Sequence, residues 1–354
     1  AHDAGGVTST DTVYALYQPV AFSEPASAEL PEGRGALAAA PLPDGRILVT
    51  GGAPAVDARA TDTALQFVPA AFAFEPAPMP LLHARMGHAA TALPDGRVLL
   101  TGGALHFEPE SLEDFVTGVE LYDPATEHFT AVPVVLPDGQ AAPTILRTRH
   151  TATLRLDDAE RPVLYLYGGV GNRSRFGQPS IGPLEFMRVF RFEDGDDGPR
   201  LVALGPPEQF RFAATAGHTL SPLDPPDAYL VAGTAVSATQ SDPLPFVLAF
   251  TAERIETRPV PAGGPPRTDH AAAPLAPGLV AVVGGRTVEA GTAIADAAIF
   301  AHEAEQFFAL PDGLPTPRWA PSATNVGQGR ILIVGGFTAT GTAFARSALL
   351  YPAP

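Results

Sequence analysis

One stretch of sequence decides the fold: Leu93-Pro94-Asp95-Gly96-Arg97-Val98-Leu99-Leu100-Thr101-Gly102-Gly103. Its Asp-Gly turn is followed by a short apolar strand, and the strand ends at a pair of glycines. An Asp-Gly turn next to an apolar run is a strong β-hairpin signal, because the turn needs positive φ angles. Glycine at the strand end allows a left-handed conformation and a close approach of neighbouring backbone. The stretch therefore predicts the second half of a β-hairpin.

The same pattern recurs along the chain. The six strand endings are Leu48-Val49-Thr50-Gly51-Gly52, Leu99-Leu100-Thr101-Gly102-Gly103, Tyr165-Leu166-Tyr167-Gly168-Gly169, Tyr229-Leu230-Val231-Ala232-Gly233, Ala281-Val282-Val283-Gly284-Gly285 and Leu332-Ile333-Val334-Gly335-Gly336. Self-similarity with a period of about 50 residues is the signature of a propeller built from repeated small sheets. In the second repeat a third strand is expected over 119–124 and a fourth around 128–132. Each repeat therefore predicts one four-stranded antiparallel blade.

The spacing within the repeats supports this interpretation. The same number of residues separates His88 from Gly103, His218 from Gly233 and His270 from Gly285. The third repeat is longer because residues 157–162 extend its hairpin, and a surface turn tolerates such an insertion. We predict an all-β fold, a six-bladed β-propeller that forms a single domain over residues 13–354 after an N-terminal tail of residues 1–12.

The two ends of the chain predict how the ring closes. The sixth repeat shows three strands, the last of them over 347–352. Residues 13–26 resemble residues 64–77, with Glu24-Pro25-Ala26 corresponding to Glu75-Pro76-Ala77. We therefore predict that a strand near residues 20–27 completes the last blade, which removes the open sheet edge.

The repeat also resembles a known family. Arg85-Met86-Gly87-His88, followed by the hairpin, the glycine pair and Tyr122-Asp123-Pro124, is similar to a kelch repeat, and the resemblance extends over nearly the whole chain. The chain departs from it at Ala232, which replaces the first glycine, and in having mostly Phe where Trp is usual in the fourth strand. More distantly, residues 88–97 resemble the strand of galactose-oxidase-type copper-radical oxidases that carries a copper-ligating His. Those enzymes also need a Tyr–Cys cross-link, and this chain has no Cys.

The amino-acid composition limits the classes of binding partner that we expect. The formal net charge is −16, and every strong base is Arg. This argues against nucleic acid and anionic membrane surfaces, which require a basic footprint. No apolar run is long enough to predict a membrane span. The absence of Cys excludes disulfides, thiolate metal sites and a Cys nucleophile, and it fits an extracytoplasmic protein, whether periplasmic, cell-surface or secreted.

Loop lengths indicate which face would bind a ligand. The loops that follow the glycine pairs, over 104–118, 170–186 and 234–245, are longer than the Asp-Gly hairpins at the opposite end of the blades. Long loops on a rigid scaffold are where binding residues concentrate. We call this side the loop face and expect the ligand there.

Two sets of residues recur where each blade begins, on the same side. The repeat arginines are Arg34, Arg85, Arg147, Arg267 and Arg318, and the repeat histidines are His88, His150, His218 and His270. The arginines either fill hydrogen bonds between blades or line a channel mouth that binds an acidic peptide or a carboxylated sugar. The histidines either hydrogen-bond a neighbouring blade or converge on a transition metal, copper or zinc. Trp319, beside Arg318, either packs between blades or offers a stacking surface at the mouth.

The sequence thus favours a non-catalytic binding module, extracytoplasmic and bacterial, which holds a protein or glycan on the loop face. Three alternatives stay open. Asp269 and His270, with Arg267, could supply the acid–base pair of a sugar mutarotase, since the chain also resembles six-bladed, kelch-like sialic-acid mutarotases. The histidines, or more weakly His106 with Glu108 and Glu110, could bind a metal. The chain could also serve as a structural part of a surface assembly.

Overall fold

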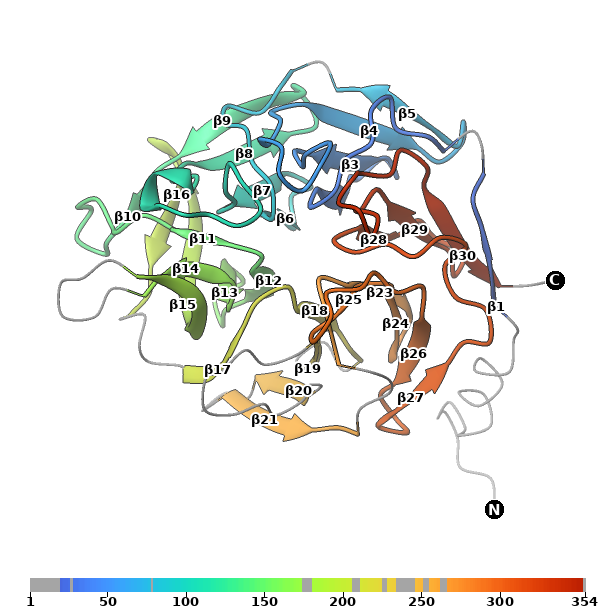
Figure 1. Ribbon diagram of the computed structural model, residues 1–354. Helices are drawn as coiled ribbons and strands as arrows, with labels where there is room; N and C mark the ends of the chain where they lie inside the picture. Colours follow the sequence, from blue (N-terminus) through green and yellow to red (C-terminus); the bar gives the residue numbers. More distant parts are fainter. Residues whose placement is uncertain are drawn as a thin grey trace, which may run out of the picture.

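The computed structural model describes residues 20–25, 28–77, 79–173, 180–205, 211–224, 228–233, 246–250, 255–261 and 266–352. Within these ranges the chain is all-β apart from one short 3-10 helix, η1 (Leu112–Asp114). The sheets are arranged around a common centre, as in a β-propeller (Figure 1). The expected tail over 1–12 and the expected loop over 234–245 lie outside the described residues. None of the described helices is long and apolar enough to cross a membrane.

Five of the sheets have four strands, and each follows the pattern expected from one repeat. The first contains β2 (Ala38–Pro41), β3 (Ile47–Thr50), β4 (Ala64–Val68) and β5 (Ala73–Pro76), and the second β6 (Ala89–Ala92), β7 (Val98–Thr101), β8 (Val119–Asp123) and β9 (His128–Val132). The fourth repeat forms β18 (Thr219–Pro222), β19 (Ala228–Ala232), β20 (Phe246–Phe250) and β21 (Ile255–Pro259). The fifth forms β23 (Ala271–Ala276), β24 (Leu279–Val283), β26 (Ala297–Ala301) and β27 (Gln306–Ala309), beside a small pair, β22 (Arg267–Thr268) with β25 (Arg286–Thr287).

The third repeat differs from the expected four-stranded blade. Its strands are β10 (Val134–Val135), β11 (Arg147–Thr148), β12 (Thr151–Leu156), β13 (Pro162–Tyr167), β14 (Val170–Asn172), β15 (Ile181–Gly195), β16 (Gly198–Ala203) and β17 (Arg211–Thr215), joined in one larger sheet. The expectation of a loop over 170–186 is corrected for residues 170–172 and 181–186, which are strand, while residues 174–179 lie outside the described residues. The first part of β15 continues beyond the blade and pairs with β14 and β17, because its backbone groups find partners there.

The N-terminal strand closes the last sheet, as the sequence predicted. β1 (Val20–Ser23) pairs antiparallel with β30 (Ala348–Pro352). β30 in turn pairs with β29 (Ile331–Val334), and β29 pairs with β28 (Ser322–Asn325). The register pairs Val20 with Pro352 and Ser23 with Leu349. The strand predicted near residues 20–27 is therefore confirmed over residues 20–23, and the first and last described strands lie in one sheet (Figure 1).

The hydrophobic core lies between neighbouring sheets. The second strands β3, β7, β24 and β29 are buried along their whole length, since each blade is covered on both faces. Leu48 of the first repeat and Leu100 of the second, for example, belong to one apolar cluster. Each repeat therefore gains its stability mainly from its neighbours, as expected of repeat architectures.

The glycine pairs join successive repeats. Gly51 and Gly52 have φ angles of 59° and 91°, and the N–H of Gly52 donates to the carbonyl oxygen of Arg85 in the next repeat at 2.9 Å. A Cβ atom on Gly51 would lie 2.2 Å from the same oxygen. Glycine is required here both for the left-handed backbone and for the close approach.

A closed ring of backbone hydrogen bonds joins the repeats at the centre. One residue from each repeat donates its N–H to the carbonyl of the equivalent residue in the preceding repeat, at 2.6–3.1 Å. The members of this central ring are Ala36, Gly87, Arg149, Gly217, Asp269 and Ala320, and Ala36 closes it by donating to Ala320. All six have positive φ, between 51° and 64°. The ring therefore holds the side chains of Arg149 and Asp269 at the axis.

Candidate binding site on the loop face

The repeat arginines lie inside the blades, and they do not line a mouth. Arg34, Arg85, Arg147 and Arg318 are almost fully buried and Arg267 is half-buried. Each donates to the carbonyl of the first glycine of its own repeat's pair, and the acceptors are Gly51, Gly102, Gly168, Gly284 and Gly335, at 2.9–3.3 Å. Burial lowers the pKa of all five. Their geometry fits the packing interpretation, since they tie the start of each blade to the end of its second strand.

The repeat histidines also connect blades. The Nε2 atom of each imidazole lies 2.8–3.3 Å from a threonine Oγ1 of the preceding repeat, and the pairs are His88–Thr50, His150–Thr101, His218–Thr151 and His270–Thr219. All four side chains are buried. Burial, with smaller charge effects, lowers the pKa of His218 and His270 to about 3. Among the described residues, no group of three or more His, Cys, Asp or Glu could hold a metal ion. The repeat histidines that the structure describes therefore do not form a ligand set for copper or zinc.

Asp269 and His270 are neighbours in sequence, but they do not form an acid–base pair. The Asp269 carboxylate is buried against two arginines, whereas the His270 ring is directed at Thr219. Trp319 is buried as well. Its Nε1 donates to the carbonyl of Thr338 at 2.9 Å, so the ring packs between repeats and is not free to stack on a ligand.

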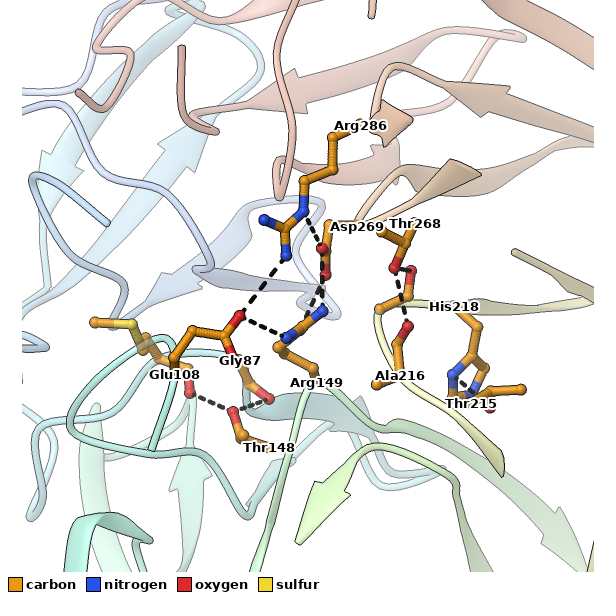
Figure 2. A network of polar contacts seen from close by, with 12 residues as sticks. Gly87, Glu108, Thr148, Arg149, Thr215, Ala216, His218, Thr268, Asp269 and Arg286 are labelled. Atoms are coloured by element: carbon orange, nitrogen blue, oxygen red, sulfur yellow. Dashed lines mark hydrogen bonds and ion pairs between the residues drawn. The ribbon is translucent and has the colours of Figure 1, made fainter. Parts of the chain in front are cut away.

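The polar side chains that do meet on the loop face form a cluster of four, which Figure 2 shows: Arg149, Asp269, Arg286 and Glu108. Nε and Nη2 of Arg149 donate to Oδ1 and Oδ2 of Asp269 at 3.0 and 3.1 Å. Nε of Arg286 donates to Oδ2 of the same carboxylate at 2.8 Å. Asp269 therefore fixes both guanidinium groups. We call these four residues the central cluster.

Backbone conformation explains how the central cluster is positioned. Arg149 and Asp269 are members of the central ring with φ of 55° and 53°, a region that costs a residue with a side chain roughly 1–2 kcal/mol. The other ring members are Gly or Ala. Gly217 lies between them in the ring, and a Cβ there would be 2.1 Å from Oδ1 of Asp269. Large polar side chains in strained positions are a feature of functional sites.

Two aromatic rings pack against the guanidinium groups of Arg149 and Arg286. The Phe107 ring centroid lies 4.7 Å from Cζ of Arg149 and 5.5 Å from Cζ of Arg286. The Trp319 ring lies 4.5 Å from Cζ of Arg286 and packs edge-on against Phe107 at 5.1 Å. These cation–π contacts further restrict the conformations of the two arginine side chains. The N–H groups that do not bond to Asp269 therefore keep a fixed orientation.

Glu108 is the loosely held member of the central cluster. It lies on the long loop of the second repeat, and its side chain is 68% exposed. Oε1 lies 3.2 Å from Nη1 of Arg149 and 3.8 Å from Nη2 of Arg286. Exposed ion pairs of this kind are worth about 0–1 kcal/mol. An external carboxylate could therefore take the place of Glu108 at little cost.

An acidic pocket adjoins this position. It has a volume of about 540 Å³, and its lining includes Asp57, His106, Glu110 and Asp114 along with Glu108 itself. The loop residues His106, Glu108 and Glu110 thus line the same pocket, but they do not form a metal-binding group. A ligand that carries a carboxylate at the arginines would extend toward an acidic wall.

Sequence reasoning missed Arg149 and Arg286. It selected Arg147 because that residue recurs, and Arg149 lies two positions later in the same run. The signal was available, however. Where the other repeats have Gly or Ala just before the His, Leu or Pro position, the third repeat has Arg149 and the fifth has Asp269. In a repeat protein such departures indicate function better than the repeated residues do.

Comparison with known proteins supports the fold. No model of a known protein family matches the chain, and no curated protein matches it. A solved structure titled "Structure of YjhT" is similar over 90% of this chain and 95% of that one, with a TM-score of 0.63 and 15% sequence identity. At this identity the similarity concerns the fold alone, a propeller-type architecture.

Proposed function

We propose that this protein is a non-catalytic binding module, a kelch-like propeller of six blades, that holds a carboxylate-bearing ligand on its loop face. The ligand class is an acidic peptide or a carboxylated sugar. One observation carries the proposal. Arg149 and Arg286 are fixed by the buried Asp269, and both direct further N–H groups toward the exposed Glu108.

Two features support six blades. The central ring has one member from each of the six repeats. In the larger sheet of the third repeat, β12, β13, β15 and β16 pair antiparallel in that order, which is the strand order of the other blades. Of the four additional strands, β11 and β14 correspond to the pair β22 and β25 of the fifth repeat, and β10 and β17 then belong to insertions around a third blade.

The ligand carboxylate would replace Glu108 between Nη1 of Arg149 and Nη2 of Arg286. Charge-assisted hydrogen bonds from guanidinium groups are among the strongest available to a carboxylate. Because Asp269, Phe107 and Trp319 already hold the arginines, binding costs little side-chain entropy. The acidic wall formed by Asp57, Glu110 and Asp114 disfavours ligands with a second negative charge nearby, so spacing between acidic groups would determine selectivity.

The mutarotase alternative has less support. The oxygens of Asp269 accept hydrogen bonds from two arginines, and the buried His270 has a pKa lowered to about 3. Neither is placed to exchange a proton with a sugar. Anomer exchange measured by NMR on sialic acid and neutral hexoses tests this directly. Catalysed exchange at any of them would favour the enzyme over the binding module.

The binding proposal is tested by calorimetric titration with a terminally blocked peptide that carries a single Glu, a uronic acid and the amide of each. We expect the acids to bind and the amides not to bind. Arg286→Gln should weaken binding about tenfold or more, and Glu108→Gln should strengthen it about threefold to tenfold. Arg258→Gln is the control, since Arg258 is exposed and pairs with Glu305. No binding of either acid, or equal binding by wild type and Arg286→Gln, would contradict the proposal.

We also propose an extracytoplasmic location, on the grounds of the Cys-free composition. Fractionation of cells that express the native gene, with immunodetection in each fraction, tests it. Detection only in the cytosolic fraction would contradict it.

A further inference from the structure

A second basic site lies in the third repeat, in a cavity of about 740 Å³. One wall is the β15 strand, where Leu184, Phe186 and Arg188 alternate onto the same side. Arg147 of β11 lines the cavity as well, and further lining residues are Leu136, Pro137, Pro143, Thr144 and Leu146. The residues of the central cluster do not line this cavity.

The two arginines have no counter-ion among the residues that the structure describes. Arg147 is buried and donates through Nη1 to the carbonyls of Leu166 and Gly168 at 3.1 and 3.3 Å. Arg188 donates to the carbonyls of Pro143 and Thr144 at 3.1–3.3 Å. Burial, together with repulsion from Arg188, lowers the pKa of Arg147 to about 9. Buried charges are normally paired, because an unpaired one loses its hydration without compensation.

The second repeat shows what is missing. There the repeat arginine Arg85 forms a fully buried ion pair with Glu120. Glu120 lies on the third strand opposite Leu100, two residues before the glycine pair. In the third repeat the equivalent residue, opposite Leu166, is Arg188. The third repeat therefore places a cation where the second places the anion that neutralises its arginine.

This reversal is confined to the third repeat. In the remaining repeats the residue opposite the equivalent second-strand position is apolar: Leu65, Val247, Ala298 and Ala348. The cavity lining includes Leu136 and Pro137, which directly follow β10, and β10 has no counterpart in the four-stranded sheets. Insertions into a single repeat commonly carry a binding function of their own. The basic pair and the cavity thus occur together, in the repeat that has the largest of the described sheets.

The geometry points to a second ligand site: we propose that the third repeat binds a small organic carboxylate with an apolar body, whose carboxylate takes the position between Arg147 and Arg188 that a side chain equivalent to Glu120 would fill. The rest of the lining supports the apolar body, since it includes Leu136, Leu184 and Phe186. A volume of about 740 Å³ lies in the range of pockets for small organic ligands.

The test uses four probes of increasing apolar size, acetate, benzoate, 3-phenylpropionate and octanoate, with 3-phenylpropionamide as the neutral counterpart. Binding is followed by ligand-observed NMR and by thermal midpoint. We expect saturable binding that strengthens from acetate to the larger carboxylates and is absent for the amide. Arg188→Gln should weaken it about tenfold or more. Arg188→Glu should abolish it, because the new carboxylate recreates the internal pair of the second repeat, and should raise the thermal midpoint of the free protein.

Two controls separate this site from others. Arg200→Gln removes an exposed arginine of β16 that pairs with Glu193, and it should leave binding unchanged. Arg286→Gln disables the central cluster and should also leave it unchanged, so this proposal and the proposed function can fail independently. Absence of binding by all four carboxylates at millimolar concentration, or an equal response of wild type and Arg188→Glu, would overturn the proposal.

Discussion

Nη2 of Arg318 donates to Oε1 of Glu24 at 2.5 Å, although 294 residues separate them in the chain. Arg318 is fully buried and Glu24 is mostly buried. The pair fixes the end of β1 against the last sheet, beside the backbone pairing of β1 with β30. It is therefore an electrostatic contribution to the closure of the ring.

Substitution of Glu24 by Gln should open this closure. Removal of one partner of a buried pair leaves the other uncompensated, and we expect a loss of about 2–4 kcal/mol in the free energy of unfolding. Urea denaturation measures it. Glu75→Gln is the matched control, because Glu75 lies in the same Glu-Pro-Ala sequence but is exposed. Equal midpoints for the two variants would show that the ion pair does not stabilise the closure.

Substitution of Gly335 by Ala should weaken the junction between the last and the first repeats. A Cβ there would lie 2.1 Å from the carbonyl oxygen of Arg34, so the junction must open. Gly291 has the same φ of 63° with nothing within 4 Å of its added Cβ. We expect about 1 kcal/mol of destabilisation for Gly291→Ala, from the backbone alone, and at least twice that for Gly335→Ala. Similar losses in urea denaturation would mean that close approach is unimportant here.

Substitution of Gly217 by Ala should disturb the central cluster through Asp269. Gly217 has a φ of 64°, so Ala costs about 1 kcal/mol in the backbone, and its Cβ atom would lie 2.1 Å from Oδ1 of Asp269 and 2.6 Å from Oγ1 of Thr268. We expect a loss of about 3 kcal/mol in wild type and about 1 kcal/mol less when Asp269 is already Ala, since the contact with Thr268 remains. Denaturation of the four proteins of this double-mutant cycle measures the coupling, and an additive result would refute the contact.

Acid should unfold the protein through its buried histidines. The pKa of His218 and His270 is lowered to about 3 in the folded state, against about 6.5 in the unfolded chain. The unfolded state therefore binds more protons between these values, and stability falls as pH decreases from about 6.5 to about 3. At pH 5 the loss is roughly 2 kcal/mol for each histidine.

The free energy of unfolding, measured from pH 8 to pH 4, checks this dependence. His270→Gln should be less stable at neutral pH but should lose less stability on acidification than wild type, because one proton uptake is removed. His128→Gln is the control, since His128 lies exposed on β9. A wild-type slope unchanged in His270→Gln would show that the imidazole already carries its proton in the folded protein.

Much of the fold could be read from the sequence because it depends on local chemistry repeated in register. The Asp-Gly hairpins, the mostly apolar second strands and the glycine pairs each favour a backbone conformation without reference to distant residues. Even the closing strand was predictable, since Glu24-Pro25-Ala26 repeats Glu75-Pro76-Ala77. Strand β14 and the first part of β15 were not predictable, because β15 finds its additional partners β14 and β17 only once the chain has folded.

The candidate sites depended on tertiary structure. From sequence alone, the recurring Arg147 was selected for the channel mouth and the single Arg149 was not. The structure directs Arg147 into the blade and places Arg149 at the axis, since Arg149 adopts the left-handed conformation of the central ring. The partners Asp269 and Arg286 come from the fifth repeat, and the relation of Arg188 to Glu120 needs the strand register. The sequence by itself determined a repeated all-β ring, because its signals are local. Only the folded chain decided which charges meet, because those contacts join residues far apart in sequence.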